Sequence, residues 1–340
     1  MTSYLSNPAL PTILKDWRGT PLSSTGHFFY PEYPFELGWR DILKWKSMPN
    51  PYQEQKKWDT WRATVVKNDS FLQHDHNVAV WLGHASFFFR LNGIRILVDP
   101  VFGKLSPLMP RYSELPLEPG RFQRIDLILV THDHRDHCDE KSLRFLLKNN
   151  PHARVLTGLG MRALLAPWSE GQSITEMGWF QQFEYETTGL KIIYLPTRHW
   201  SRRWLTDTNQ RLWGAFLFQT DDLTIYFGGD SGYGSHYSQT ATLFPRIDHA
   251  WLGIGAFAPE WFMHSNHTSP MDAWQAFQDL KAGSMSPMHY GTFDLSDEPL
   301  GEPERLMREI VRENKADEKV KILTIGEAFP LRSRWLENVK

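Results

Sequence analysis

The feature that most constrains this chain is a cluster of imidazole and carboxylate side chains directly after a short apolar run. The run is Ile125–Val130, and Thr131–His137 follows it with three histidines and two aspartates in six consecutive positions. A short apolar run of this kind predicts a buried strand, and Glu140–Asn149 behind the cluster predicts a helix. The cluster is therefore expected on a loop at the carboxyl end of a strand, where α/β folds place their functional sites.

The spacing inside the cluster suits two neighbouring metal ions. His132 and His134 are two residues apart, so both rings can point the same way on an extended loop. Asp136 and His137 lie beyond the turn and can face a second point. Imidazole and carboxylate together suit Zn²⁺, Mn²⁺ or Fe. The alternative is a solvated polar loop, but the full His-x-His-x-Asp-His pattern is far more specific than a lone His-x-His, and we predict metal binding.

The bulk composition is that of an ordinary globular protein. The chain has 340 residues, of which 41% are hydrophobic and 22% charged, so one large domain or two smaller ones can form. A net charge of -2 gives no indication of a nucleic-acid partner. Cys138 is the only cysteine, which excludes an intramolecular disulfide and fits a reducing compartment. We expect a cytoplasmic protein without a signal peptide, and without an apolar run near the roughly 18 residues of a spanning helix.

Residues 1–75 differ from the rest of the chain because prolines and aromatic residues are interleaved there. We interpret this stretch as an extended arm with a short helix near Leu37–Lys46, packed on a main domain at residues 76–340. A further hypothesis is that the aromatic and basic residues of this helix contact an acyl chain or a membrane surface peripherally, since both kinds suit a headgroup boundary. The sequence also leaves open a homodimer.

From Asn77 the pattern becomes one of short strands. Asn92-Gly93 between two apolar runs is the strongest short signal of a hairpin. Ser269, followed by Pro270 and by Asp272, predicts the start of a helix. A second helix is expected near Glu304–Glu313, and Met285–His289 is expected to reach a loop. The predicted strands are Val78–Leu82, Ser86–Leu91, Ile94–Val98, Arg154–Thr157, Phe183–Thr187, Leu190–Leu195, Gly214–Gln219, Leu223–Phe227, Ala250–Ile254 and Val320–Ile325.

Three further candidate ligands lie just past strand ends or turns. They are His199, Asp230 and His289, and the glycines before Asp230 would let the backbone approach a metal closely. Each is weak alone, because a single histidine past a strand is usually structural and Gly-Gly-Asp is often only a turn. Together with the first loop they supply seven ligands of suitable chemistry.

The order of these residues resembles the metallo-β-lactamase superfamily over residues 77 to 325. More narrowly, several segments resemble the branch of N-acylphosphatidylethanolamine-hydrolysing phospholipase D and its bacterial relatives. These segments are Trp81–Ala85, Asp99–Phe102, Arg198–Arg202, Gly229–Tyr233, Trp261–Met263 and His289–Phe293. The resemblance implies an α/β fold of the αβ/βα type, a sandwich of two mixed β-sheets with helices on the outer faces.

The resemblance also implies two zinc ions, with Mn²⁺ or Fe as alternatives. The first ion would be held by His132, His134 and His199, and the second by Asp136, His137 and His289. Asp230 would bridge the two ions beside a water or hydroxide, orient this nucleophile and shuttle its proton.

Several residues are assigned around the ligands. Asp99 would support the motif loop from behind, and His84 is expected there as well, with a simple turn residue as its alternative. His267 matches a histidine near the site of the phospholipase D branch, so it could contact the phosphate or the leaving group. Alternatively, it could cap the helix that follows. Arg202 and Arg203 could pair with a phosphate or face water, and Cys138 is expected to pack. The histidines interpreted as structural are His27, His74, His76, His152, His236 and His249.

The implied activity is that of a zinc-dependent phosphodiesterase whose partner is a phospholipid, such as an N-acylphosphatidylethanolamine, or another phosphodiester. The alternative is a metal-dependent lactonase or an ester hydrolase of a small substrate, with or without a phosphate group. A non-catalytic metal-binding module is the third interpretation. Apolar walls above the metals would favour a lipid over a small polar substrate.

Overall fold

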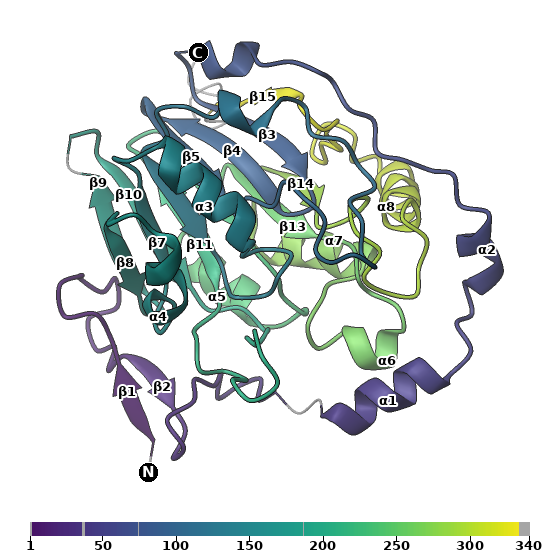
Figure 1. Cartoon of the computed structure of the whole chain (residues 1–340), viewed down its shortest axis with the longest axis horizontal. Coiled ribbons are helices and arrows are strands. Elements are labelled where there is room, and N and C mark those ends of the chain that lie inside the picture. Colours follow the sequence, from purple (N-terminus) through teal and green to yellow (C-terminus); the bar gives the residue numbers. More distant parts are fainter. Residues whose placement is uncertain (1, 36–37, 74, 186, 333–340) are drawn as a thin grey trace.

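The structure is a computed structural model that describes residues 2–35, 38–73, 75–185 and 187–332 (Figure 1). Two mixed sheets lie face to face. The six-stranded sheet has the order β14 (Ser284–Met288), β13 (His249–Gly253), β12 (Thr224–Phe227), β11 (Ala215–Gln219), β10 (Leu190–Leu195) and β9 (Gln181–Tyr185). The seven-stranded sheet has the order β15 (Ala328–Pro330), β3 (Val78–Gly83), β4 (Ser86–Leu91), β5 (Ile94–Val98), β6 (Leu127–Val130), β7 (Arg154–Gly158) and β8 (Ile174–Met177).

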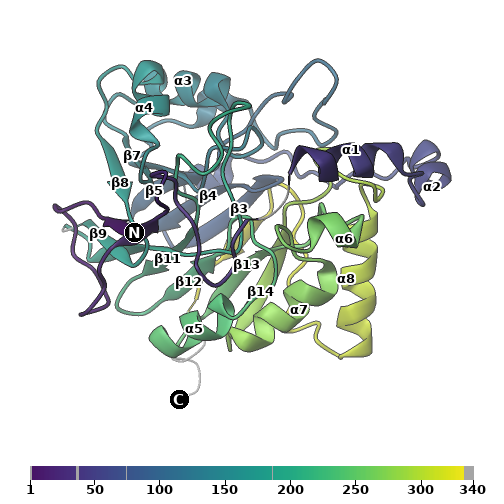
Figure 2. The ribbon, with the colours of Figure 1, turned by 90° about the horizontal axis from the view of Figure 1, so that it is seen from below.

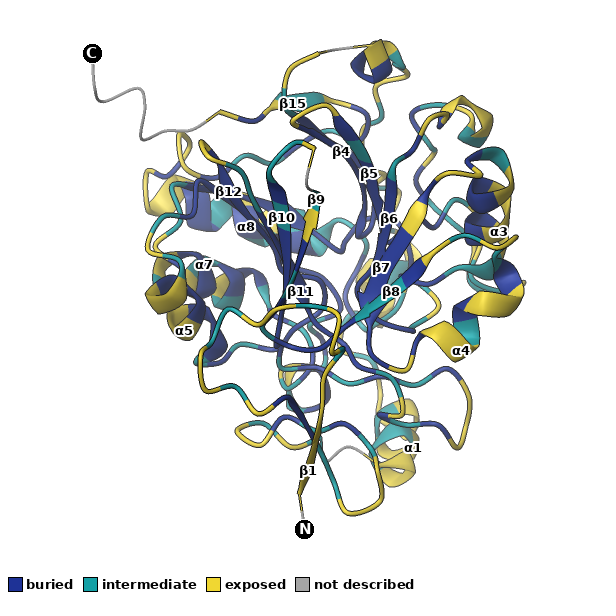
Figure 3. Cartoon of the chain, turned by 90° about the vertical axis from the view of Figure 1, so that its left-hand side faces the viewer, coloured by how far each residue is buried: buried dark blue, intermediate teal, exposed yellow. Residues whose placement is uncertain are grey.

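Helices cover the outer faces of both sheets, as Figure 3 shows. The helices α3 (Glu140–Asn149) and α4 (Arg162–Leu165) lie against the seven-stranded sheet, and α5 (His236–Leu243), α7 (Pro270–Asp279) and α8 (Glu302–Glu313) lie against the six-stranded sheet. The predicted αβ/βα sandwich is therefore confirmed.

The strands read as continuous apolar runs because both faces of the sheets are covered. On β4, Phe87 and Phe89 point into the layer between the sheets, and the ring of Phe89 lies 5.1 Å from that of Trp251 and 5.3 Å from that of Phe218. Phe88 points the other way, into the layer beneath α3. Burying each such side chain contributes about 1.5–3 kcal/mol to folding.

Local signals set several element ends as predicted. Asn92 and Gly93 both have positive φ angles, +48° and +82°, which a type I′ hairpin turn between β4 and β5 requires. Ser269 caps α7, because its side chain accepts a hydrogen bond from Asp272 N, and Pro270 occupies the first turn. The short predicted helix near Leu37–Lys46 is α1 (Trp39–Ser47), although Leu37 itself lies outside the described residues.

One predicted strand was wrong, and one strand is present where the sequence predicts none. Val320–Ile325 is not a strand, because the chain there crosses from one sheet to the other and makes only single bridges, Val320 to Met285 and Ile325 to Val65. Among the described residues, the last strand is β15. The segment Met285–His289 does reach a loop at His289, but the residues before it belong to β14, whose Pro287 is tolerated because this strand lies at the edge of its sheet. The other predicted strands are confirmed within two residues at their ends.

The first part of the chain runs along one end of the sandwich (Figures 1 and 2). The strands β1 (Ser3–Leu5) and β2 (Thr20–Leu22) pair with each other, and the segment between them bonds to the region of β9, where Gln182 N donates to Pro11 O at 3.0 Å. On the other side lie α1 and α2 (Gln53–Lys57), and Trp45 of α1 donates its Nε1–H to Asp297 Oδ1 at 3.0 Å. The division into an arm and a main domain stays a prediction.

Candidate metal centre

The seven candidate ligands lie together at one end of the sandwich. In the six-stranded sheet, β10 and β12 are both antiparallel to β11, and β12, β13 and β14 are parallel, so β10, β12 and β14 end at the same edge. His199 follows β10, Asp230 follows β12 and His289 follows β14. The loop after β6 in the other sheet brings the remaining four, and all seven fall into groups that could hold a metal ion.

The first group consists of three imidazoles and one carboxylate. Nδ1 of His134 lies 2.9 Å from Nε2 of His132 and 3.2 Å from Nε2 of His199. The carboxylate oxygen Oδ2 of Asp230 lies 3.9 Å from Nε2 of His132 and 3.7 Å from Nε2 of His199. Three nitrogens and one oxygen converging on one point match the ligand set of a tetrahedral transition-metal ion.

The second group contains more negative charge. Nε2 of His289 lies 3.4 Å from Oδ2 of Asp136 and 3.2 Å from Oδ1 of Asp230. Nε2 of His137 lies 3.1 Å from Oδ2 of Asp230. The carboxylate of Asp230 therefore borders both groups, as a residue between two cations would.

Hydrogen bonds behind the ligands fix the tautomers of three histidines. Nδ1 of His137 donates to Oδ2 of Asp99 at 2.7 Å, and Nδ1 of His132 donates to Oγ1 of Thr131 at 3.0 Å. Thr131 Oγ1 in turn donates to Asp99 at 2.6 Å, while Nδ1 of His199 donates to a main-chain carbonyl oxygen at 2.9 Å. The Nε2 atom of each ring therefore faces the site and is the atom available to a metal, which is the usual arrangement behind a metal-binding imidazole.

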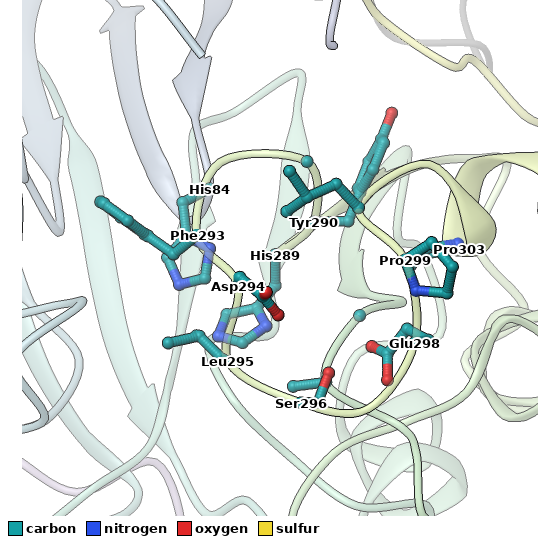
Figure 4. A pocket seen from close by; sticks show the side chains of 14 residues that line it. His84, His289, Tyr290, Phe293, Asp294, Leu295, Ser296, Glu298, Pro299 and Pro303 are labelled. Carbon is teal, nitrogen blue, oxygen red and sulfur yellow. The ribbon is translucent and has the colours of Figure 1, made fainter. Parts of the chain in front are cut away.

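His84 lies beside the second group. It donates from Nε2 to Oδ2 of Asp136 at 2.9 Å, and its ring lies 4.0 Å from the ring of His289. Figure 4 shows both rings in the lining of a cavity of about 20 Å³ beneath the loop that follows His289. His84 has a positive φ of +54°, and its N–H donates to Thr292 Oγ1 at 2.8 Å, so the backbone holds this ring in place.

Burial and the neighbouring charges decide which groups are ionised. Burial alone would raise the pKa of Asp230, but the imidazoles of His137 and His289 outweigh it and hold that pKa well below its usual range. Burial lowers the pKa of His132 well below its usual value, and His137 adds to this effect, so His132 stays neutral. Burial also acts to lower the pKa of His289, yet the carboxylates of Asp230 and Asp136 raise it to about 9. Buried, ionised carboxylates of this kind call for a cation.

Several atoms of the candidate ligands are buried and have no hydrogen-bond partner among the described residues, as expected of atoms that bind a metal ion. Within the described ranges, Nε2 of His137, Nε2 of His289 and Oδ1 of Asp230 are buried without a hydrogen-bond partner. An unsatisfied buried polar atom costs about 1–3 kcal/mol, so such atoms normally have a ligand. Imidazole nitrogen and carboxylate oxygen are donors that zinc, manganese and iron accept. The residues present therefore fit divalent transition-metal ions.

A cavity of about 210 Å³ lies directly above the two groups, with Asp136 and Asp230 in its lining. Its polar side is formed by Arg202, Asn266 and His267. Its walls are otherwise apolar, and the arm and the domain share them: Phe35, Ile42, Trp200, Phe262, Met263 and Leu295.

The structure also separates the alternatives left open for the surrounding residues. His267 does not cap α7, since Ser269 does, and its Nδ1 lies 3.8 Å from Oδ2 of Asp230. Burial lowers the pKa of His267 to about 4, so its ring is neutral near pH 7. Arg202 lines the cavity with its guanidinium 4.8 Å from the ring of Trp200. Cys138 is fully buried among apolar side chains, which agrees with packing.

Sequence reasoning missed a clamp on the motif loop. Arg203 is buried rather than turned to a phosphate, and it donates to the carbonyl oxygens of Cys138 at 2.6 Å and Asp133 at 3.2 Å. Arg211 donates to the carboxylate of Asp133 at 2.9 Å. No local pattern marks these contacts, because the partners are about seventy residues apart in the chain.

Two of the histidines interpreted as structural have hydrogen-bond partners inside the fold. His236 and His249 are buried and bonded to serine hydroxyls, and His74 lies outside the described residues. No helix among the described residues has the length and apolar character that crossing a membrane requires. The homodimer stays a prediction.

The chain belongs to the β-lactamase superfamily. The model of the beta-lactamase superfamily domain matches residues 94–290, which is more than half of the chain. Together with the site, this membership makes the protein a metal-dependent hydrolase of the metallo-β-lactamase fold.

Two similar sequences agree with this placement, and one solved structure shows the same fold. The N-acyl-phosphatidylethanolamine-hydrolyzing phospholipase D 1 of Caenorhabditis elegans is 27% identical over 309 residues, which are 86% of this chain and 87% of that protein. A metal-dependent hydrolase of Hyperthermus butylicus is 32% identical, over 73% of this chain and 97% of that protein. The solved isothiocyanate hydrolase from Delia radicum gut bacteria superposes with a TM-score of 0.61 at 17% identity, over 75% of this chain and 99% of that one. The predicted superfamily and the resemblance to the phospholipase D branch are confirmed.

Proposed function

We propose that this protein is a binuclear-metal phosphodiesterase that hydrolyses a phospholipid of the N-acylphosphatidylethanolamine type. The observation that carries this proposal is the cavity above Asp136 and Asp230, whose walls are apolar while its floor is ionised. Such a cavity suits a substrate with a phosphate at one end and acyl chains at the other. The similarity to the nematode phospholipase D supports the same substrate class.

The first metal ion would be held by His132, His134 and His199. The second would be held by Asp136, His137 and His289, with Asp230 shared between them. Zinc is the proposed ion, with manganese and iron as alternatives. Two bound cations would act as Lewis acids on a phosphoryl oxygen and would make water a stronger nucleophile at neutral pH.

The chain's own residues orient and relay protons around this centre. The ionised carboxylate of Asp230 accepts a proton from the attacking water, and Asp99 keeps the ring of His137 in position from behind. Neutral His267 offers a hydrogen bond at the wall of the cavity, where the leaving oxygen would emerge.

The proposed reaction joins a water oxygen to phosphorus and breaks the bond from phosphorus to the amino-alcohol oxygen. The products are a phosphatidic acid and an N-acylethanolamine. The apolar wall favours this lipid over the small polar substrate that a lactonase or small-ester hydrolase would need. Arg202 lies where it can face a phosphate oxygen that the metals leave uncovered.

A lipid substrate brings the protein to a membrane surface, and α1 is proposed to contact it. Trp39 and Leu43 on this helix are 65% and 57% exposed, whereas Ile42 turns inward to the cavity. Lys44 and Lys46 lie on the same helix, and long basic side chains beside exposed apolar ones suit the headgroup boundary.

The test is release of phosphatidic acid from vesicles that contain N-acylphosphatidylethanolamine, followed by mass spectrometry. The zinc-loaded chain should release it, Asp230→Asn should abolish the release, and Asp221→Asn, a matched change at an exposed carboxylate, should not. Hydrolysis of bis(p-nitrophenyl) phosphate without any hydrolysis of the lipid would contradict a phospholipid substrate. If Asp230→Asn kept both activities, Asp230 and the residues around it would not be the active site.

A further inference from the structure

The long connection between β10 and β11 carries the most exposed apolar pair beside the site. Trp200 and Arg202 line the cavity, and the next residues of the connection turn out to the surface. There Trp204 is 59% exposed and Leu205 is 93% exposed. Long irregular connections of this kind in a compact domain are usually functional, and exposed apolar side chains on them mark interaction sites.

The base of this connection is held firmly, so the exposed pair is not the product of a loose loop. Arg203 is buried and donates to two carbonyl oxygens of the metal-binding loop, those of Asp133 and Cys138. The N–H groups of Arg203 and Trp204 both donate to Oδ1 of Asp207, at 3.0 and 2.7 Å. The apolar pair is therefore presented at a fixed position relative to the metal centre.

One arginine lies against the exposed pair, and a second lies on the same connection. The guanidinium of Arg135, which lies between ligands on the metal-binding loop, is 5.2 Å from the ring of Trp204. Arg202 lies on the cavity side of the same connection. Apolar side chains flanked by arginines fit an anionic lipid surface, because the rings and the leucine can enter the acyl boundary while the guanidinium groups stay with the phosphates.

The exposed pair and α1 both belong to elements that border the cavity. Ile42 of α1 and Trp200 of the connection line the same cavity, and we call α1 and the segment around Trp204 and Leu205 the rim of this cavity. A flat surface touching both parts of the rim would cover the mouth of the cavity.

We propose that Trp204 and Leu205 form a docking tip that inserts into the surface of an anionic phospholipid bilayer. The tip sets the second point of contact, with α1 as the first, and holds the metal centre at a fixed depth below the headgroups. The proposal rests on the proposed function for its purpose, but its test does not depend on hydrolysis.

The test measures binding of the full chain to sedimented vesicles of phosphatidylcholine with phosphatidylserine, and of phosphatidylcholine alone. The double variant Trp204→Ala/Leu205→Ser should bind the anionic vesicles about tenfold more weakly than the wild type. The matched control is Phe145→Ser on the outer helix α3, where the side chain is 41% exposed, and it should bind like the wild type. Turnover of soluble bis(p-nitrophenyl) phosphate should be unchanged in both variants.

Four results would overturn the docking tip. The double variant could bind anionic vesicles as well as the wild type, or Phe145→Ser could lose as much binding as the double variant. The double variant could change the oligomeric state, which would make a second copy of the chain the occupant of this surface. It could also lose turnover of the soluble diester, which would make the tip a support of the metal loop. Tip-dependent vesicle binding without lipid hydrolysis would sustain the tip and contradict the proposed substrate.

Discussion

The metal centre and the rim of its cavity lie next to each other but differ in burial and bonding. At the centre, His132, His137 and His199 are at most 3% exposed, and each has a hydrogen-bond partner behind its ring. On the rim, Trp39 and Leu205 are 65% and 93% exposed. The side chains that could hold metal ions thus all come from one chain and are buried, whereas the rim exposes apolar side chains to solvent. Changes at the centre should affect every substrate, and changes at the rim only substrates in a membrane.

Metal removal should produce the largest effect. A chelator should abolish turnover of soluble and lipid substrates alike, because the buried carboxylates of Asp136 and Asp230 lose their cations. When the free metal concentration is about a thousand times its Kd, removing the metal lowers the free energy of unfolding by on the order of 4 kcal/mol, which lowers Tm by roughly 10 °C. Differential scanning calorimetry before and after chelation measures this, and re-addition of zinc should restore both values. An unchanged Tm would contradict a metal-filled centre.

Asp99→Asn should produce the next largest effect. This substitution removes the negative charge that faces Nδ1 of His137, while Nε2 of His137 still faces the site. Loss of such a partner typically lowers metal affinity or activity by about 10–100-fold. Competition with a chromophoric chelator measures the affinity. The matched control is Asp126→Asn, directly before β6, where the carboxylate of Asp126 accepts a hydrogen bond from Arg95 N. Equal losses of metal affinity in both variants would show that Asp99 acts only on the fold.

His236 tests the burial of a histidine that is not a candidate ligand but bonds to the hydroxyl of Ser231, next to Asp230. Burial, helped by Arg198, lowers the pKa of His236 to about 3, whereas an unfolded histidine has a pKa near 6.5. Below about pH 6.5 the unfolded chain therefore binds a proton that the folded chain does not, and stability falls as the pH drops toward 3. Between pH 7 and 5 this group accounts for about 2 kcal/mol, which His236→Gln should remove from the pH dependence.

Urea unfolding at the two pH values measures the effect of His236. His152→Gln, at an exposed histidine, is the matched control and should leave the pH dependence as it is. If His236→Gln retained the full wild-type pH dependence of stability, the buried neutral histidine would not be its source.

Changes on α1 should have the smallest effect. Trp39→Ala/Leu43→Ser removes two exposed apolar side chains that touch no ligand. We expect a loss of about two- to fivefold in turnover of vesicle substrate, with unchanged turnover of the soluble diester, since partial insertion of one helix face stabilises binding only modestly. An equal loss of turnover on the vesicle substrate and on the soluble diester would contradict the different roles proposed for the centre and the rim.

The sequence predicted the centre better than the rim, for physical reasons. His132, His134, Asp136 and His137 lie close together in the chain, after an apolar run that predicts a buried strand, so their meeting point did not depend on distant contacts. Their convergence with Asp230 depended on three strands ending at one edge of a sheet, which the family resemblance supplied and spacing alone did not.

The parts that could not be predicted depend on tertiary packing. Nothing local shows that Arg203 reaches the metal-binding loop or that Ile42 lines the cavity, because each partner lies far away in the sequence. Pro287 hid β14, since proline is rare in strands except at edges, and the edge is visible only in the assembled sheet. The apolar run at Val320–Ile325 looked like a strand, but no neighbour runs beside it for more than one residue.

The most direct test of the central claim is the number of metal ions that one folded chain binds. The chain should be stripped with chelator, titrated with zinc, freed of excess metal by gel filtration and analysed for metal and protein. Two equivalents of zinc per chain in the wild type, falling to one or none in Asp230→Asn, is the predicted result. One equivalent or none in the wild type, or two in Asp230→Asn, would contradict a pair of cations held on either side of this carboxylate.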